Sequence, residues 1–235
     1  YADGIFVVVG TYKIFTSTDG ITWISRESSS TVLNGATLTD VTYGDNSFVA
    51  VGYKTEGVNR PVILSSSDGI AWTLEDAGVT SGVLIGIHYA SGQFVTVGES
   101  GMILTSPDTT TWTQKTSGVS YELRGVGYGE STFVVVGSTG TILTSPNTIT
   151  WTQRNSGSNY GLRDVTYENG IFVTVADGGD VLTSNNAITW TEQTSGLLSA
   201  LSHSLTGILG KSVPNFCNAL RRPFIAGDED TDASC

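Results

Sequence analysis

The chain has 235 residues, of which 39% are hydrophobic and 14% are charged, and its formal net charge is −11. This composition is too apolar for a disordered chain, and the acidic charge argues against general binding to the nucleic-acid backbone. No stretch approaches twenty apolar residues, so we expect no transmembrane segment. The length is compatible with one all-β domain.

Two patterns recur five times along the chain. An apolar run marked by a phenylalanine reads FVVVG, FVAVG, FVTVG, FVVVG and FVTVA. A tryptophan follows in one local frame, which reads TSTDGITW, SSSDGIAW, TSPDTTTW, TSPNTITW and TSNNAITW. The last three tryptophans lie about 39 residues apart and the earlier gaps are somewhat longer. The phenylalanine column is Phe6, Phe48, Phe94, Phe133 and Phe172.

Each copy contains short runs with β-strand composition. One unit reads LRGVGY, FVVVG, TILTS and TWTQ, and its runs are bounded by Gly, Ser, Asn or Asp. Four strands in about 40 residues is the length of one propeller blade. We therefore predict an all-β fold, a five-bladed β-propeller of four-stranded blades. The predicted propeller spans residues 1–210, with repeats at about 1–41, 42–87, 88–126, 127–165 and 166–210.

The tryptophan frame has a structural explanation. A short carboxylate or amide can accept hydrogen bonds from the backbone N–H groups that follow it, which closes a turn. The tryptophan can bury a large apolar area between neighbouring sheets. Metal binding and catalysis are the alternatives, but a frame present in every unit favours a structural role. The pairs are Asp19 with Trp23, Asp68 with Trp72, Asp108 with Trp112, Asn147 with Trp151, and Asn186 with Trp190.

These frames resemble the Asp-box of the sialidase-like (BNR) and photosystem II assembly factor propellers. The resemblance covers residues 1 to about 196 and implies a propeller fold. It also implies that each box lies on a turn between the third and fourth strands of a blade. It carries little information about activity, because the box occurs in enzymes and non-enzymes alike.

The first copy begins without the Leu-x-x-Val run that precedes the other phenylalanine runs. Residues 205–208 match that missing run, as a comparison with residues 123–126 shows. We therefore predict that a strand near residues 205–209 pairs with the first repeat and closes the ring. Residues 211–235 fit the repeat badly and are predicted to be an irregular tail. A sixth, broken blade or a fragment of a longer propeller are the alternatives.

Cys217 and Cys235 are the only cysteines in the sequence. A disulfide between them would close a short loop and contribute about 3 kcal/mol in the chain-entropy model. Two free thiols in a loose tail are the alternative. A disulfide would suit an oxidising compartment, and together with the acidic composition it gives an expected location that is extracellular, periplasmic or at the cell surface.

The sequence contains few residues suited to catalysis or metal binding. His88 and His203 are the only histidines, and no cysteine pair has zinc-ligand spacing. We predict no catalytic residues, no metal and no cofactor. Glycoside hydrolysis needs two carboxylates across a sugar, and Asp40 and Asp164 occupy equivalent strand positions, with Glu122 near another. The arginine motif that the sialidase resemblance implies near the N-terminal blade is absent.

The best candidate site combines tyrosine and arginine at matching positions of adjacent blades. Tyr121 precedes one predicted innermost strand, and Arg124 lies at the beginning of that strand. Tyr160 and Arg163 hold the same two positions in the next repeat. Aromatic rings and guanidinium groups are common anchors for ligands. We predict that these four residues bind a protein or glycan ligand near one rim of the channel. The alternative is that each tyrosine covers a sheet edge and each arginine solvates the channel.

Three functional classes follow. The first is a non-enzymatic binding or scaffolding module that recognises a protein or glycan partner through one rim of the ring. The second, implied only by the resemblance, is an assembly-factor-like chaperone of a membrane complex. The third is a sialidase-like glycoside hydrolase. The sequence does not determine the oligomeric state.

Overall fold

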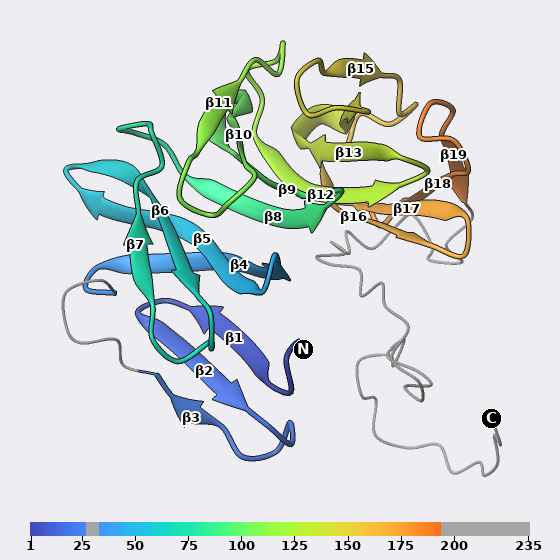
Figure 1. Ribbon diagram of the computed structural model, residues 1–235. Helices are drawn as coiled ribbons and strands as arrows, with labels where there is room; N and C mark the ends of the chain where they lie inside the picture. The colour runs from blue at the N-terminus through green and yellow to red at the C-terminus, as the bar shows by residue number, and fades with distance from the viewer. Residues whose placement is uncertain (27–32, 194–235) are drawn as a thin grey trace, which may run out of the picture.

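The computed structural model describes residues 1–26 and 33–193. Within these residues the chain forms five antiparallel sheets that follow one another around an arc (Figure 1). The helical elements of this part are two short 3-10 turns, η1 (Glu99–Gly101) and η2 (Ser138–Gly140). No helix in the two described ranges has the length and hydropathy needed to cross a membrane. The all-β prediction is therefore confirmed.

The first sheet has three strands and the other four have four strands each. The bounds are β1 (Phe6–Gly10), β2 (Lys13–Ser17) and β3 (Ile24–Ser25); β4 (Ala36–Gly44), β5 (Ser47–Glu56), β6 (Val58–Ser66) and β7 (Thr73–Glu75); β8 (Leu84–Ala90), β9 (Gln93–Gly98), β10 (Ile103–Ser106) and β11 (Thr113–Lys115); β12 (Leu123–Gly129), β13 (Thr132–Gly137), β14 (Thr141–Ser145) and β15 (Thr152–Arg154); and β16 (Leu162–Glu168), β17 (Ile171–Ala176), β18 (Val181–Ser184) and β19 (Thr191–Gln193).

Strands pair in chain order within every sheet. The first strands of successive four-stranded sheets, β4, β8, β12 and β16, also contact one another and form the inner side of the arc. The predicted repeat boundaries fall inside these four strands, so the sequence repeat is offset from the sheet. Residues 205–209 and 211–235 lie outside the described residues, so ring closure, the number of blades and the tail stay predictions.

The four innermost strands share one irregularity, a β-bulge near the beginning of each strand. A bulge leaves one residue without a partner in the ladder and redirects its side chain. In β12 and β16 the residues at the bulge are Arg124 and Arg163, so the bulge sets the direction of two side chains of the predicted site. The register shifts lie between Leu38 and Asp40, Leu84 and Gly86, Leu123 and Gly125, and Leu162 and Asp164.

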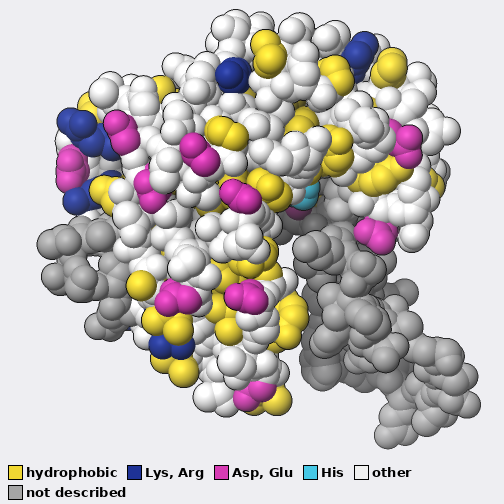
Figure 2. Space-filling view, viewed as in Figure 1, with side chains coloured by type: hydrophobic (Ala, Val, Ile, Leu, Met, Phe, Trp, Pro, Cys, Tyr) yellow, Lys and Arg dark blue, Asp and Glu magenta, His cyan; other side chains and the backbone are white. Residues whose placement is uncertain are grey.

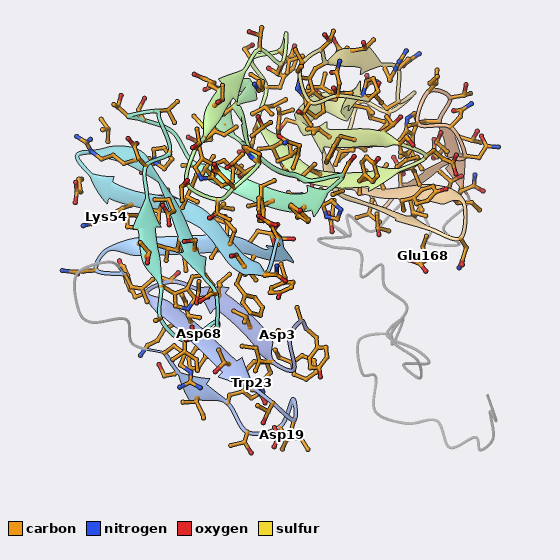
Figure 3. All side chains as sticks on the ribbon, viewed as in Figure 1. Asp3, Asp19, Trp23, Lys54, Asp68 and Glu168 are labelled. Carbon is orange, nitrogen blue, oxygen red and sulfur yellow. The ribbon has the colours of Figure 1, made fainter. Side chains whose placement is uncertain are left out.

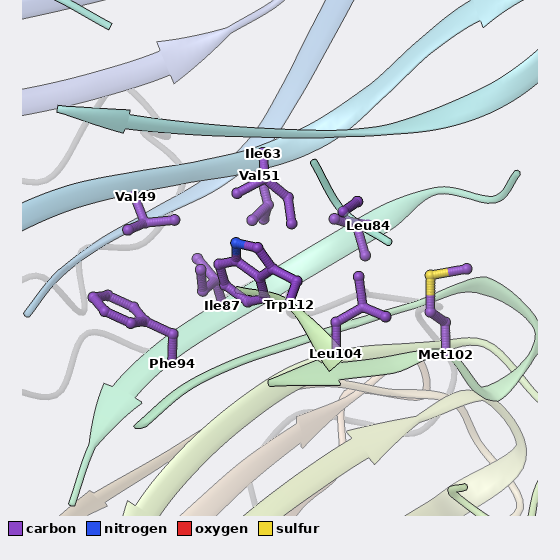
Figure 4. Packing of buried hydrophobic residues seen from close by; sticks show 10 residues of the cluster. Val49, Val51, Ile63, Leu84, Ile87, Phe94, Met102, Leu104 and Trp112 are labelled. Atoms are coloured by element: carbon purple, nitrogen blue, oxygen red, sulfur yellow. The ribbon is translucent and has the colours of Figure 1, made fainter. Parts of the chain in front are cut away.

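The hydrophobic core lies between neighbouring sheets. Trp112 packs against Val49, Val51 and Ile63 of the preceding sheet and against Phe94 of its own sheet (Figure 4). The other buried clusters likewise combine residues of neighbouring sheets. Burial of so large an apolar surface is the main stabilising term of such a stack. The repeat is therefore stable only beside another copy of itself.

The first sheet is less covered than the others. Trp23 is 41% exposed, whereas the equivalent Trp72, Trp112 and Trp190 are buried. Figure 3 shows Trp23 and Asp19 at one end of the first sheet, with Asp68 of the next sheet reaching toward it. In Figure 2 hydrophobic side chains gather over this sheet. In the part of the chain that the structure describes, the first sheet packs against the second, through β1 against β4, and Trp23 belongs to none of the buried clusters.

The turns between the third and fourth strands have one hydrogen-bond pattern. Asp19 Oδ1 accepts hydrogen bonds from the backbone N–H groups of Ile21 and Thr22 at 2.8 and 2.7 Å. These bonds lower the pKa of Asp19 to about 2. The same two bonds recur at Asp68, Asp108, Asn147 and Asn186.

Candidate functional site

The linkers between sheets and the turns between second and third strands lie at one end of the strands. This follows from antiparallel order, because the Asp and Asn turns described above join third to fourth strands at the opposite end. Backbone bonds join the linkers to these turns: Glu99 N–H to Val83 O at 3.0 Å, Gly101 N–H to Tyr121 O at 2.7 Å, Ser138 N–H to Glu122 O at 2.8 Å, and Asp177 N–H to Gly161 O at 2.9 Å. We call the surface formed by residues 99–101, 116–122, 138–140, 155–161 and 177–180 the linker face.

Both tyrosines of the predicted site lie exposed on the linker face. Tyr121 is 49% exposed and Tyr160 is 56% exposed. The ring of Tyr160 rests on the backbone at Gly178, where an added Cβ would lie 2.8 Å from Cδ2 of the ring. Only glycine permits this approach. The backbone therefore supports the Tyr160 ring while more than half of the side chain stays open to a partner.

The arginines of the predicted site form an ion-pair network with two acids. Arg124 Nε lies 2.6 Å from Glu122 Oε1, and Arg124 Nη1 lies 3.1 Å from Asp177 Oδ2. Arg163 Nε contacts the other oxygen of Asp177. Asp177 thus joins two arginines, one from the fourth sheet and one from the fifth. We call Glu122, Arg124, Arg163 and Asp177 the ion-pair network.

Arg124 is the most enclosed member of the ion-pair network, with 16% of its side chain exposed. An added Cβ at Gly161 would lie 2.5 Å from Arg124 Nη1, so the guanidinium runs directly against the linker beside Tyr160. Burial alone would lower the pKa of Arg124, but the hydrogen bonds to Glu122 and Asp177 outweigh it and raise the pKa above its usual value. Arg124 therefore stays charged and fixed in place.

The structure thus brings all four predicted site residues to one face, but it also shows that both guanidinium groups are paired within the chain. Asp177 was missed from the sequence. Its signal was present, because Asp177 follows β17 at the turn position that Glu99 and Ser138 occupy in the two preceding sheets. An acid at this turn faces the arginine at the bulge of its own sheet.

A polar hollow of about 630 Å³ reaches as far as Ser120, the residue before Tyr121. Ser100 and Gly101 form one wall and residues 114–120 form the other. Lys115 is the one charged residue of this lining. Elsewhere, Figure 2 shows acidic and basic side chains scattered over the visible surface rather than gathered in one large patch.

The carboxylates considered for sugar hydrolysis are bonded to the backbone. Asp40 accepts hydrogen bonds from the N–H groups of Val41 and Ile87, both at 2.8 Å. Burial raises the pKa of Asp40 to about 6. Asp164 accepts a bond from the Val165 N–H at 2.8 Å. Glu122 belongs to the ion-pair network.

No group of three or more metal-binding side chains occurs within residues 1–26 and 33–193, and His203, Cys217 and Cys235 lie outside these ranges.

Comparison with known proteins supports the fold. No protein-family model and no curated protein match the chain. Among solved structures, YCF48 bound to D1 peptide is 19% identical, with a TM-score of 0.58 over 79% of this chain and 62% of that one. A streptogramin B lyase is 12% identical, with a TM-score of 0.70 over 88% of this chain and 73% of the lyase.

A catalytically inactive virginiamycin B lyase from Staphylococcus aureus, solved with quinupristin, is 13% identical, with a TM-score of 0.73. That match covers 89% of this chain and 73% of the lyase. The chain spans 62% of the length of the YCF48 chain that it matches. At these identities the likeness shows the fold alone. The chain therefore has the β-propeller fold, which these comparisons find both in a peptide-bound protein and in lyases.

Proposed function

We propose that this chain is a non-enzymatic binding or scaffolding module that recognises a protein partner at the linker face of the fourth and fifth sheets. The observation that carries the proposal is the pair of exposed tyrosines next to the ion-pair network. Tyr121 directly precedes Glu122 in the chain, and the ring of Tyr160 rests at Gly178, which follows Asp177. Rigid aromatic side chains are frequent anchors in protein interfaces because they offer large contact area at low entropy cost. Here, Gly178 supports the Tyr160 ring from below.

The peptide bound to YCF48 supports a protein partner, because it shows that a chain with this fold can bind a peptide. Nothing comparable supports a glycan. The same likeness also favours the second candidate, an assembly-factor-like chaperone of a membrane complex. The two candidates differ in the partner alone, and identification of a captured partner as a membrane-complex subunit would select the second.

The proposal that the chain is not an enzyme rests on its carboxylates. Both oxygens of Asp40 accept backbone hydrogen bonds, so a role for Asp40 in sugar hydrolysis would require breaking a contact between β4 and β8. The lyases among the similar structures show that this fold also carries enzymes. Turnover of a chromogenic glycoside by the wild-type chain that is lost in Asp40→Asn would overturn this part of the proposal.

We further infer a ring of five blades built on Asp-box turns and closed by residues 205–209. Two observations support it. The first sheet has three strands within the described residues, and residues 205–208 repeat the Leu-x-(Asp/Gly)-(Val/Ile) pattern of the four innermost strands. We also propose an extracellular, periplasmic or cell-surface location. Electrophoresis of the native protein under non-reducing conditions would test it, because a disulfide between Cys217 and Cys235 is expected in an oxidising compartment.

The binding proposal is tested by capture of partners from native extract with matched variants. Tyr121→Ala combined with Tyr160→Ala removes the aromatic anchors. Ile149→Ala combined with Ile188→Ala removes similarly exposed apolar side chains, 67% and 53% exposed, from the opposite end of the same two sheets. We expect a partner captured by wild type and by the isoleucine variant but lost with the tyrosine variant. Equal capture by all three chains, or loss with the isoleucine variant alone, contradicts the proposal.

A further inference from the structure

The ion-pair network carries two positive and two negative charges and is neutral as a unit. A ligand carboxylate that approached Arg124 or Arg163 would meet guanidinium groups already balanced by Glu122 and Asp177. The ligand carboxylate would lose its hydration and would gain little electrostatic attraction in return, so its binding would not be favoured. A ligand cation faces the same balance with the signs reversed. Neither kind of charge is favoured at this position.

The ion-pair network nevertheless keeps hydrogen-bonding capacity toward solvent. Arg163 and Glu122 are each partly exposed, and a guanidinium has five N–H donors whereas a carboxylate has two acceptor oxygens. Glu122 and Arg163 form the two ends of the ion-pair network, because Arg124 and Asp177 pair between them. An acceptor and a donor are therefore offered at separate points, where they can bond to N–H and C=O groups spaced along an extended peptide backbone. The exposed rings of Tyr121 and Tyr160, next to the ion-pair network, supply apolar contact. The neighbouring hollow is lined by uncharged side chains and backbone apart from Lys115.

From this geometry we propose that the linker face binds an uncharged, extended peptide segment. Its backbone bonds to Arg163 and Glu122, and its apolar side chains contact the rings of Tyr121 and Tyr160. The inference rests on the proposed function, which supplies the site but not the chemistry of its ligand. It distinguishes this chain from a receptor for acidic peptides, which the two arginines alone would suggest.

Charge balance at the linker face depends on Asp177, because this one carboxylate faces two guanidinium groups. Asp177→Asn keeps the shape of the side chain and leaves the ion-pair network with one net positive charge. Asp180 lies in the same turn and makes no ion pair with a described residue. Asp180→Asn is therefore a matched control that changes the net charge of the chain equally without releasing a guanidinium.

The test uses an array of synthetic peptides whose net charge runs from strongly negative through zero to strongly positive. We expect uncharged peptides to bind wild type best, with affinity that changes less than about twofold between about 50 and 500 mM NaCl. Asp177→Asn should bind acidic peptides about two- to fivefold more tightly at low salt, the size expected of a solvent-exposed ion pair. Asp180→Asn should show no such gain.

Two other results would contradict the inference, and they are distinguishable. In the first, the wild-type chain prefers charged peptides and this binding weakens strongly in salt, which overturns the inference that the ligand is uncharged. The proposed function still stands if Tyr121→Ala combined with Tyr160→Ala abolishes the binding of these charged peptides. In the second, no peptide on the array binds in a way that depends on Tyr121 and Tyr160, which overturns the proposed function and the inference together.

Discussion

Asp40 on β4 accepts a hydrogen bond from the backbone N–H of Ile87 on β8, so one carboxylate joins the second sheet to the third. Its other oxygen accepts the N–H of Val41 within its own strand. The equivalent position is glycine in the next two sheets, where an added Cβ at Gly86 or Gly125 would collide with the neighbouring innermost strand. Close approach of the innermost strands is therefore achieved by glycine in two sheets and by a bridging acid in the second.

The first prediction concerns pH and Asp40. Burial raises the pKa of Asp40 from 3.8 to about 6, so the folded chain holds this proton more tightly than the unfolded chain. The stabilising contribution of the protonated form is fully present below about pH 4 and is lost as pH rises through 6. We expect the difference in unfolding free energy between wild type and Asp40→Asn to decrease over this window in urea titrations. A difference that stays constant, or grows with pH, would show that Asp40 is not buried in this way.

The second prediction concerns the turn amides. Asn147 Oδ1 accepts the N–H groups of Ile149 and Thr150 at 2.9 and 3.1 Å. Asn147→Ala should lower the unfolding free energy by about 1 kcal/mol, by analogy with the loss of a helix cap. Asn147→Asp keeps the acceptor and is the control, which should lose much less. Equal losses for the two variants in chemical denaturation would rule out the acceptor role.

The third prediction compares two equivalent tryptophans. Trp112 Nε1 donates to Thr109 O at 2.7 Å, whereas the buried Trp151 Nε1 has no acceptor in the part of the chain that the structure describes. Replacement by phenylalanine removes the same indole from each site. Trp112→Phe should therefore cost about 1 kcal/mol more than Trp151→Phe, because only the first loses a hydrogen bond. A larger cost at Trp151, measured by urea unfolding, would contradict this comparison.

The repeat made the fold predictable from the sequence, whereas the chemistry of the site was not. The phenylalanine and tryptophan columns recur because each must be buried against a neighbouring sheet, so spacing alone predicts strands and turns. The long β5–β6 hairpin explains why the second repeat is longer than the others. Tyr121 and Tyr160 were found because each stands three residues before an arginine at matching positions of adjacent repeats.

The partners of Arg124 and Arg163 were not found, because Asp177 lies far from Arg124 in sequence and meets it only when the fifth sheet packs against the fourth. The turn position of Asp177 could have indicated the contact with Arg163 of its own sheet, but nothing in the sequence indicates the contact with Arg124 of the preceding sheet. The predicted closure by residues 205–209 depends in the same way on contacts between the two ends of the chain, and it stays a prediction.

The fourth prediction tests ring closure. A chain that ends at residue 200 lacks the predicted closing strand, whereas a chain that ends at residue 211 retains it. We expect the shorter chain to unfold at a lower urea concentration than the longer one, because the first sheet would lack its fourth strand. Identical unfolding midpoints would show that residues 205–209 contribute nothing to the fold.

Photo-cross-linking tests directly whether the linker face of the fourth and fifth sheets is the binding face. A photoreactive phenylalanine analogue is placed in turn at positions 121, 160, 149 and 188, and each chain is irradiated in native extract. We predict that positions 121 and 160 form an adduct with one and the same partner, and that positions 149 and 188 do not. Adducts formed at positions 149 and 188 but not at 121 and 160 would place the partner at the opposite end of the sheets and rule out the linker face as the binding face.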